Sequence, residues 1–165
     1  MIIIANIFTA IGELFMAYST FSKSKKNMLI VQVCDCIFNL IGCLFIGAYS
    51  AAVVNIIAGT RNLLNAKNKN NIYINGLLVA VLVWLGLILN KNGLIGLLPV
   101  LASLIYTICS YMLKSAQGLR YIICFNMIMW FVHDFSIGLY SSACFDVLIL
   151  VVSFINIIRF NKDSK

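Results

Sequence analysis

The chain has 165 residues, of which 62% are hydrophobic and 10% are charged. Its mean hydropathy of +1.02 excludes an ordinary soluble domain, in which roughly 45 to 50% of residues are apolar. The net charge of +7 gathers at the breaks between apolar segments, which argues against a nucleic-acid partner.

Seven apolar segments follow one another along the chain, each near the roughly 20 residues that cross a bilayer core of about 30 Å. The first has no Lys or Arg before its apolar run and contains Glu13, so we interpret it as a retained helix rather than a secretory signal. We predict an all-α membrane protein with seven transmembrane helices. Their expected ranges are 2–21, 27–46, 50–67, 72–90, 93–113, 118–135 and 140–160.

Lys and Arg residues mark one side of this predicted bundle. They follow the first, third, fifth and seventh segments, whereas the opposite side carries Lys91. By the positive-inside rule, we predict the N-terminus outside and the C-terminus inside. The residues on the inner side are Lys23, Lys25, Lys26, Lys67, Lys69, Lys114, Arg120, Arg159, Lys162 and Lys165.

A short motif occurs twice. Residues 46–52 read IGAYSAA and residues 137–143 read IGLYSSA, 91 residues further along. The same shift aligns Lys23 with Lys114 and Asn65 with Asn156. Parallel repeats of this kind relate the two halves of some membrane transporters about an axis along the membrane normal. We predict a 3+1+3 plan: a first triple-helix bundle over residues 1–67, a linker transmembrane helix over 68–92 and a second triple-helix bundle over 93–165.

Polar residues form stripes on four predicted helices, at the spacing of one helix face. Asn and Ser can simply hydrogen-bond neighbouring helices, at about 0.6 kcal/mol each. Four stripes in register favour a shared polar cavity. They comprise Gln32, Asp35, Asn39 and Gly42 on the second helix, Ala51, Asn55, Ala58, Asn62 and Asn65 on the third, Asn126, Trp130 and His133 on the sixth, and Ser142, Asp146, Ile149, Ser153 and Asn156 on the seventh.

Acidic residues within these helices are the main site candidates. Glu13 lies near the middle of the first helix, where a charged carboxylate costs a few kcal/mol unless it is paired, hydrated or protonated. Together with Asp35, it is expected to line a substrate or proton path. Its partner at a shift of 91 is Leu104, so the cavity should be asymmetric. We expect Asp134 and Asp146 to lie nearer the outer boundary, in contact with water.

Three further residues have alternative roles. Arg61 can pair with Glu13 or Asp35, bind an anionic group, or extend to the inner boundary. His133, the single histidine, can titrate in the cavity or lie at the membrane interface. Pro99 is interpreted as a hinge or a static bend of the fifth helix, because nearby hydroxyls can satisfy backbone groups that a kink frees.

The six cysteines lie within the predicted helices. Cys34 and Cys36 point to opposite sides of the second helix, which favours small-residue packing over a metal site. The sequence contains no glycine-rich phosphate loop, HExxH or GxSxG motif. We therefore predict no enzyme activity, no cofactor and no metal.

Longer segments resemble the YgjV-type family of bacterial inner-membrane proteins. They are IGAYSAA followed by Arg61, LLPVLAS at 97–103, and WFVHDF at 130–135 leading to NIIRF at 156–160. The resemblance implies a bacterial inner membrane and recurring positions at Arg61, Pro99, Trp130, His133 and Arg159, but no substrate. The 3+1+3 plan is also similar to SWEET, PQ-loop and PnuC-like transporters, although their Pro-Gln dipeptide is absent and Pro99 is the single proline where SWEET members have a set of hinge prolines.

We predict a transporter that moves a small polar solute across the lipid bilayer, through a cavity between the two bundles. The alternative is a non-transporting ligand receptor or an interaction subunit, since endoplasmic-reticulum retention receptors share this architecture. The oligomeric state stays open, a homo-oligomer included. The expected solute-binding residues are Glu13, Asp35, Asn39, Asn55, Arg61, Asn126, Trp130, His133 and Asp146, with Pro99 as a hinge.

Overall fold

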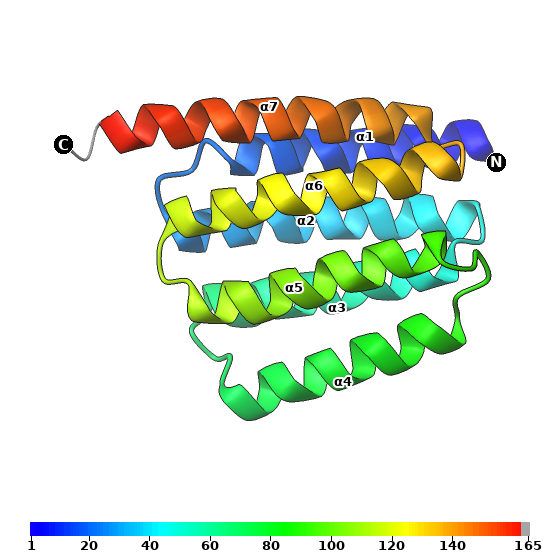
Figure 1. Cartoon of the computed structure of the whole chain (residues 1–165), viewed down its shortest axis with the longest axis horizontal. Coiled ribbons are helices and arrows are strands. Elements are labelled where there is room, and N and C mark those ends of the chain that lie inside the picture. The colour runs from blue at the N-terminus through cyan, green and yellow to red at the C-terminus, as the bar shows by residue number, and fades with distance from the viewer. Residues whose placement is uncertain (163–165) are drawn as a thin grey trace.

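The computed structural model describes residues 1–162, which form seven α-helices and one short 3₁₀ helix (Figure 1). The predicted all-α fold is confirmed over these residues, and Lys165 lies outside them. The elements are α1 (Ile2–Ser19), α2 (Lys25–Phe45), α3 (Tyr49–Ala66), α4 (Ile72–Ile88), η1 (Ile95–Leu97), α5 (Leu98–Met112), α6 (Ala116–Ser136) and α7 (Tyr140–Lys162).

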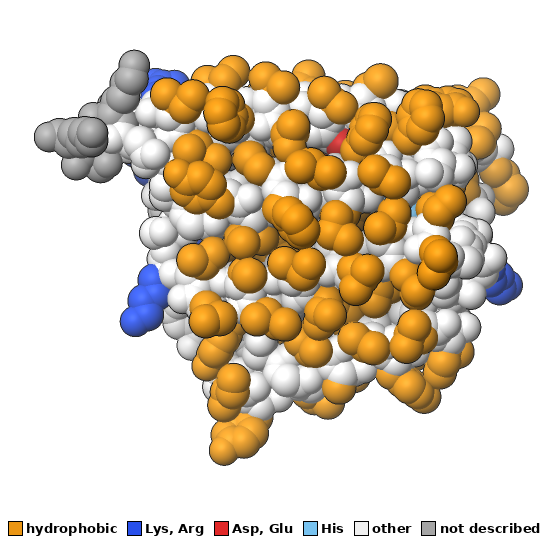
Figure 2. Space-filling model, in the orientation of Figure 1, with side chains coloured by type: hydrophobic (Ala, Val, Ile, Leu, Met, Phe, Trp, Pro, Cys, Tyr) orange, Lys and Arg blue, Asp and Glu red, His pale blue; other side chains and the backbone are white. Residues whose placement is uncertain are grey.

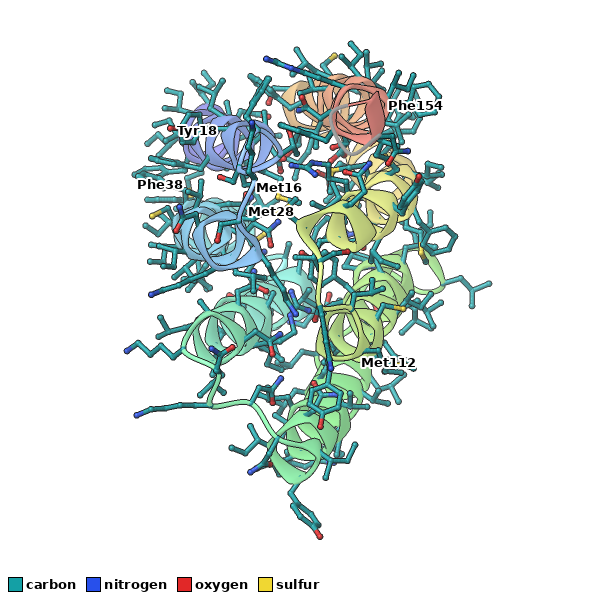
Figure 3. The ribbon with its side chains drawn as sticks, turned by 90° about the vertical axis from the view of Figure 1, so that its left-hand side faces the viewer. Met16, Tyr18, Met28, Phe38, Met112 and Phe154 are labelled. Atoms are coloured by element: carbon teal, nitrogen blue, oxygen red, sulfur yellow. The ribbon has the colours of Figure 1, made fainter. Side chains whose placement is uncertain are left out.

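The helices lie side by side in two rows (Figure 3). One row holds α1, α2 and α3, and the other holds α7, α6 and α5. Contacts of α1 with α7 and of α3 with α5 join the rows, and α4 packs against α3 and α5. The cavity described below therefore lies between segments far apart in sequence.

The connections fall at two ends of the molecule (Figure 1). The α1–α2, α3–α4 and α5–α6 connections lie together, and we call this the basic end because Lys23, Lys67 and Lys114 belong to it. The other three connections and the N-terminus lie at the opposite end, which we call the Lys91 end. The expected segregation of basic residues is thus present in the fold.

The surface is apolar and much of the interior is polar. Hydrophobic side chains cover the face drawn in Figure 2, and large ones such as Leu14, Trp84 and Phe154 are exposed. Met16 and Met28 point between the rows, whereas Phe154 points outward (Figure 3). Nearly as many polar as apolar residues are buried. This inverts the usual soluble pattern and fits a surrounding of lipid.

In the part of the chain that the structure describes, four helical segments are long and apolar enough to cross a membrane: Ile2–Ser19, Lys25–Phe45, Ile95–Met112 and Tyr140–Asn161. The α4 helix is apolar but has 17 residues. The other two helices are more polar, since α3 contains Arg61 and α6 contains Arg120.

The repeated motif forms the same turn twice. Gly47, between α2 and α3, has φ +72°, and Gly138, between α6 and α7, has φ +82°. In the first turn the Ala48 amide donates to the Cys43 carbonyl at 3.0 Å, and in the second the Leu139 amide donates to Asp134 at 2.8 Å. Both bonds close the end of a helix whose last residues lack intrahelical partners. The motif therefore recurs because α2 and α6 end in the same way and the chain reverses direction after each of them.

The fifth helix starts later than expected. Residues 95–97 form a 3₁₀ turn, and α5 begins at Leu98. Gly93 has φ +58°, and the Asn90 side chain donates to the Gly93 carbonyl at 2.7 Å, which holds a loop where helix was predicted. Pro99 lies in the first turn of α5, where its missing N–H interrupts no hydrogen bond. The kink expected inside the helix is therefore unnecessary.

Candidate functional site

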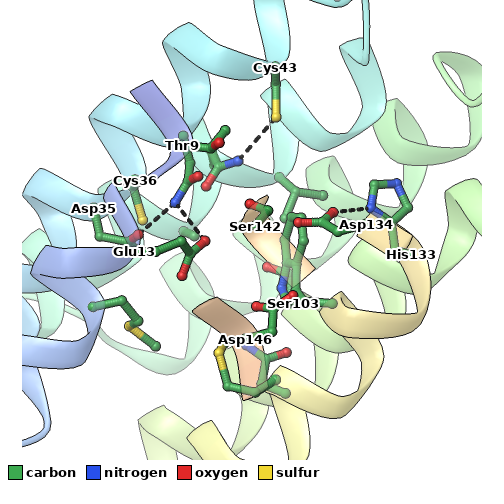
Figure 4. A pocket seen from close by; sticks show the side chains of 18 of the residues that line it. Thr9, Glu13, Asp35, Cys36, Cys43, Ser103, His133, Asp134, Ser142 and Asp146 are labelled. Atoms are coloured by element: carbon green, nitrogen blue, oxygen red, sulfur yellow. Dashed lines mark hydrogen bonds and ion pairs between the residues drawn. The ribbon is translucent and has the colours of Figure 1, made fainter. Parts of the chain in front are cut away.

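A cavity of about 70 Å³ lies between the two rows. Residues from α1, α2, α3, α5, α6 and α7 line it, so both halves of the chain contribute (Figure 4). A water molecule occupies about 30 Å³ in the liquid, so the space suits a few waters or one small solute. All nine predicted solute-binding residues line this cavity, whereas Pro99 does not.

One wall carries a bridged pair of acidic residues. The Asn39 side-chain amide donates to Asp35 Oδ1 at 2.6 Å and to Glu13 Oε1 at 3.4 Å (Figure 4). Asp35 and Asn39 are one turn apart on α2, and α1 packs against this face. Glu13 and Asp35 are each 8% exposed. Neither carboxyl group faces lipid, as the high cost of such exposure requires.

The opposite wall presents Asn126 from α6 and Asp146 from α7. Shifted by 91 residues, Asn126 corresponds to Asp35, and Asp146 corresponds to Asn55. Each pair thus combines one acid with one amide, and all four residues line the cavity. Asp146 Oδ2 and Asn126 Oδ1 are buried and have no hydrogen-bond partner among the described residues.

Asp134 and Asp146 are buried, contrary to the expectation that they contact water. They are 4% and 2% exposed, respectively. Asp134 lies next to His133, and its Oδ1 is 2.7 Å from His133 Nδ1. The turn at Gly138 contributes to the burial of Asp134, because it places the buried Leu139 beside the end of α6 and its amide on the Asp134 carbonyl.

Trp130 lies at the centre of the packing. It contacts all three clusters of buried hydrophobic residues, and its ring meets the His133 imidazole edge-on at 5.7 Å. Its side chain is half-buried and also lines the cavity. The cavity thus offers an aromatic surface beside its acidic groups.

Within residues 1–162, Arg61 neither pairs with an acid nor extends to the boundary. It is 3% exposed, its guanidinium lies 4.3 Å from the centre of the Tyr106 ring, and it donates to Asn62 Oδ1 at 3.0 and 3.1 Å. A further bond of 2.8 Å reaches Thr107 Oγ1. The planar guanidinium suits such stacking and forked hydrogen bonding, so its donors point toward neutral groups of α3 and α5.

Cations close the basic end by bonding across the halves. Lys25 Nζ, on α2, donates to the Ser110 and Leu113 carbonyls at the end of α5, at 2.9 and 2.5 Å. Arg120, on α6, donates to the Thr20 and Ser22 carbonyls beyond α1, at 2.9 and 2.6 Å. Positive charge is favourable at helix C-termini. We call these contacts the Lys25 and Arg120 clasps.

The Lys91 end is hollow instead. A second hollow of about 570 Å³ lies there, between the N-terminus and the connections at residues 46–48, 92–95 and 136–139. It shares Ala48, Ile137 and Leu139 with the cavity. These three residues therefore lie where the acidic interior meets the hollow at the Lys91 end.

Tyr106 is a lining residue that the sequence pattern did not indicate. Its hydroxyl donates to Gln32 Oε1 at 2.8 Å, and Asn62 donates to the same oxygen at 3.3 Å. An aromatic residue on an apolar helix gives no signal of its own. Its position one residue before Thr107, on the face of the helix that meets Arg61, is evident only from the packing of α3 against α5.

A family model described as "Bacterial inner membrane protein", Imp-YgjV, matches residues 3–164, nearly the whole chain. The chain belongs to this family. Membership of the YgjV family agrees with the apolar surface and the predicted inner-membrane location. No curated protein and no solved structure matches the chain, so the likeness to SWEET-type transporters stays a prediction.

Proposed function

We propose that this YgjV-family protein transports a small polar solute across the bacterial inner membrane, through the cavity between its two rows of helices. One observation carries the proposal: nine polar or aromatic residues from both halves of the chain line one cavity. Polar groups buried in a membrane bundle are costly and commonly mark a solute path. The shared boundary at Ala48, Ile137 and Leu139 gives that path an opening toward the Lys91 end.

We further propose that all seven helices span the bilayer as a parallel 3+1+3 repeat, with the N-terminus outside. Three observations support the repeat: the identical turns at Gly47 and Gly138, the exchange of acid and amide between equivalent positions, and the contacts of α1 with α7 and of α3 with α5. Because a shift of 91 residues relates α1 to α5 and α3 to α7, the α1–α7 contact and the α3–α5 contact are equivalent. An axis along the membrane normal accounts for all three.

The clasps at the basic end suggest how access to the cavity changes from one side of the membrane to the other. Lys25 and Arg120 each bond one half to the other, at the end opposite the second hollow. The arrangement described here then corresponds to a state open toward the Lys91 end. Opening of the basic end requires both clasps to break and the halves to rock apart.

Flux into proteoliposomes tests the proposal. The solutes are radiolabelled methylammonium, glycine, glycerol and acetate, which differ in charge at similar size. We expect at least one to enter faster than into protein-free vesicles. Glu13→Gln should lower that flux by about tenfold, because an amide keeps the size but loses the charge-assisted contact. Ser153→Ala is the control, since Ser153 is buried on α7 outside the cavity lining.

Thermal stability is measured in parallel, so that a folding defect of Glu13→Gln is recognised. Normal flux with Glu13→Gln would remove this carboxylate from the mechanism. If none of the four solutes shows flux but one of them still binds to the protein, the ligand receptor is favoured over the transporter.

A further inference from the structure

The cavity concentrates the acidic groups of the chain. Four of its five acidic residues line the cavity: Glu13, Asp35, Asp134 and Asp146. The fifth, Asp163, lies outside the described residues. Of the described Lys and Arg residues, Arg61 alone lines the cavity, and its donors are bonded to Asn62 and Thr107. A protein of net positive charge thus has an interior rich in carboxyl groups.

Acceptors also predominate among the buried, unpartnered polar atoms of the cavity lining. Asn39 uses its amide hydrogens on Asp35 and Glu13. On the facing wall, Asp146 Oδ2 and Asn126 Oδ1 accept no hydrogen bond from the described residues, although Asp146 is 2% and Asn126 9% exposed. Buried polar atoms normally have partners. These two atoms are acceptors, so their missing partner is a donor. Ser103 Oγ, the other unpartnered atom of the cavity lining, can donate or accept.

From these observations we propose that the cavity binds a small organic ammonium ion, such as a short primary alkylamine, between Asp146 and Asn126 on one wall and Glu13 and Asp35 on the other. The ammonium group carries three N–H donors for the unpartnered oxygens. The short alkyl chain packs on Trp130, whose ring face also attracts a cation. This names the solute class of the transporter proposed above, and in that respect it rests on the proposed function.

Two other ligand types suit the cavity less well. An anion would meet four carboxyl groups and an arginine whose donors are already bonded. A bare metal ion needs converging ligands, and no three His, Cys, Asp or Glu residues of the described chain are close enough to hold one. An ammonium ion directs its hydrogens to separate acceptors and needs no such convergence.

Tryptophan fluorescence of the full-length protein in detergent tests the proposal. Trp130 and Trp84 are the two tryptophans, and Trp84 is 64% exposed on α4, so Trp84→Phe leaves Trp130 as the reporter. Ethylammonium chloride, potassium chloride, ethanol and sodium acetate are titrated at constant ionic strength. We expect a saturable change with ethylammonium alone, with binding weakened at least about tenfold by Asp146→Asn.

Two variants complete the design. Ser153→Ala, on the same helix but outside the cavity lining, should leave the titration unchanged. Asn126→Asp places an acid where the other half has Asp35, so it should tighten ethylammonium binding several-fold. The expected gain in affinity of Asn126→Asp tests the proposal even if Asp146→Asn fails to fold.

The outcomes separate the ligand class from transport. Saturation by potassium, ethanol or acetate, or no saturation by ethylammonium, overturns the proposed ligand. Weaker ethylammonium binding by Asn126→Asp also contradicts it. Saturable ethylammonium binding without methylammonium flux would support the proposed ligand class but contradict transport. Flux of glycerol without ethylammonium binding would support transport but contradict the proposed ligand class.

Discussion

Arg61 illustrates a buried cation that is stabilised by neutral groups. Its guanidinium stacks on Tyr106 and bonds to Asn62 and Thr107. Asn62 in turn bonds to Gln32 on α2. The arginine therefore ties α3 to α5, and through Asn62 to α2, instead of balancing the carboxyl groups of the cavity.

Replacing Arg61 by Lys should destabilise the protein by about 2 kcal/mol, because Lys keeps the charge but loses the fork and the stacking. The measurement is thermal unfolding in detergent, followed by intrinsic fluorescence. Thr60→Ala serves as the control, since Thr60 is exposed beside Arg61 and bonds within its own helix. Equal stability of Arg61→Lys and the original protein would mean that these contacts contribute little.

At the residue scale, helical periodicity predicted nine residues that line the cavity, but its stripes also included Asn65, Ser153 and Asn156, which do not. It did not predict how deep the side chains lie. The spacing of Asp35 and Asn39, and the shift to Asn126, follow directly from the sequence. The burial of Asp134 does not, because it depends on how the chain turns back at Gly138. The partners of Arg61 belong to another helix, and distant contacts of this kind leave no local pattern.

At the scale of elements, the two glycine turns determine how α2 meets α3 and how α6 meets α7. Both glycines have a positive φ, which a residue with a Cβ adopts at a cost of about 1 to 2 kcal/mol. A Cβ built on Gly138 would meet no atom within 4 Å. Any penalty at this position is therefore conformational rather than steric.

Gly138→Ala should lower the free energy of unfolding by about 1 kcal/mol. Gly76→Ala provides a matched control within α4, because a Cβ there also meets no atom within 4 Å, and alanine is about 1 kcal/mol better than glycine inside a helix. The two variants should shift the unfolding temperature in opposite directions. A shift of the same sign in both would show that backbone conformation is not the cause.

Helix boundaries were predicted to within a few residues except at the start of α5. Apolar residues continue through 94–98, so hydropathy alone extends the helix to residue 93. The side chain of Asn90 decides the local structure by bonding to the loop backbone. The role of Pro99 was also hard to predict from the sequence. A proline restricts the backbone wherever it lies, but the sequence does not tell which turn of the helix it occupies.

At the scale of the whole molecule, the distribution of basic residues predicts the orientation in the membrane. In a variant without the six native cysteines, a membrane-impermeant maleimide added from the periplasmic side should label Lys91→Cys. It should miss Lys26→Cys, Lys67→Cys and Lys114→Cys, because these exposed positions lie at the basic end and positive charge is retained in the cytoplasm.

Labelling after membrane disruption provides the control, since all four positions should then react. Periplasmic labelling of residues 26, 67 and 114, with protection of residue 91, would reverse the predicted orientation. Mixed labelling within the three basic-end positions would contradict seven complete spans.

The sequence indicated one polar cavity and a repeated plan, because both depend on spacing along the chain. It could not indicate the unpartnered oxygens or the clasps, which arise only when helices from different halves meet. In the sequence, for example, Arg120 indicates only the membrane topology. In the structure, its guanidinium donates to the backbone carbonyls of Thr20 and Ser22, beyond α1.

The acids of the cavity do not follow the proposed twofold plan of its scaffold, since Glu13 has Leu104 as its counterpart and Asp35 has Asn126. A molecule turned end for end in the cavity therefore meets a different set of neighbours. Any ligand with a distinct head and tail should therefore bind in a single orientation.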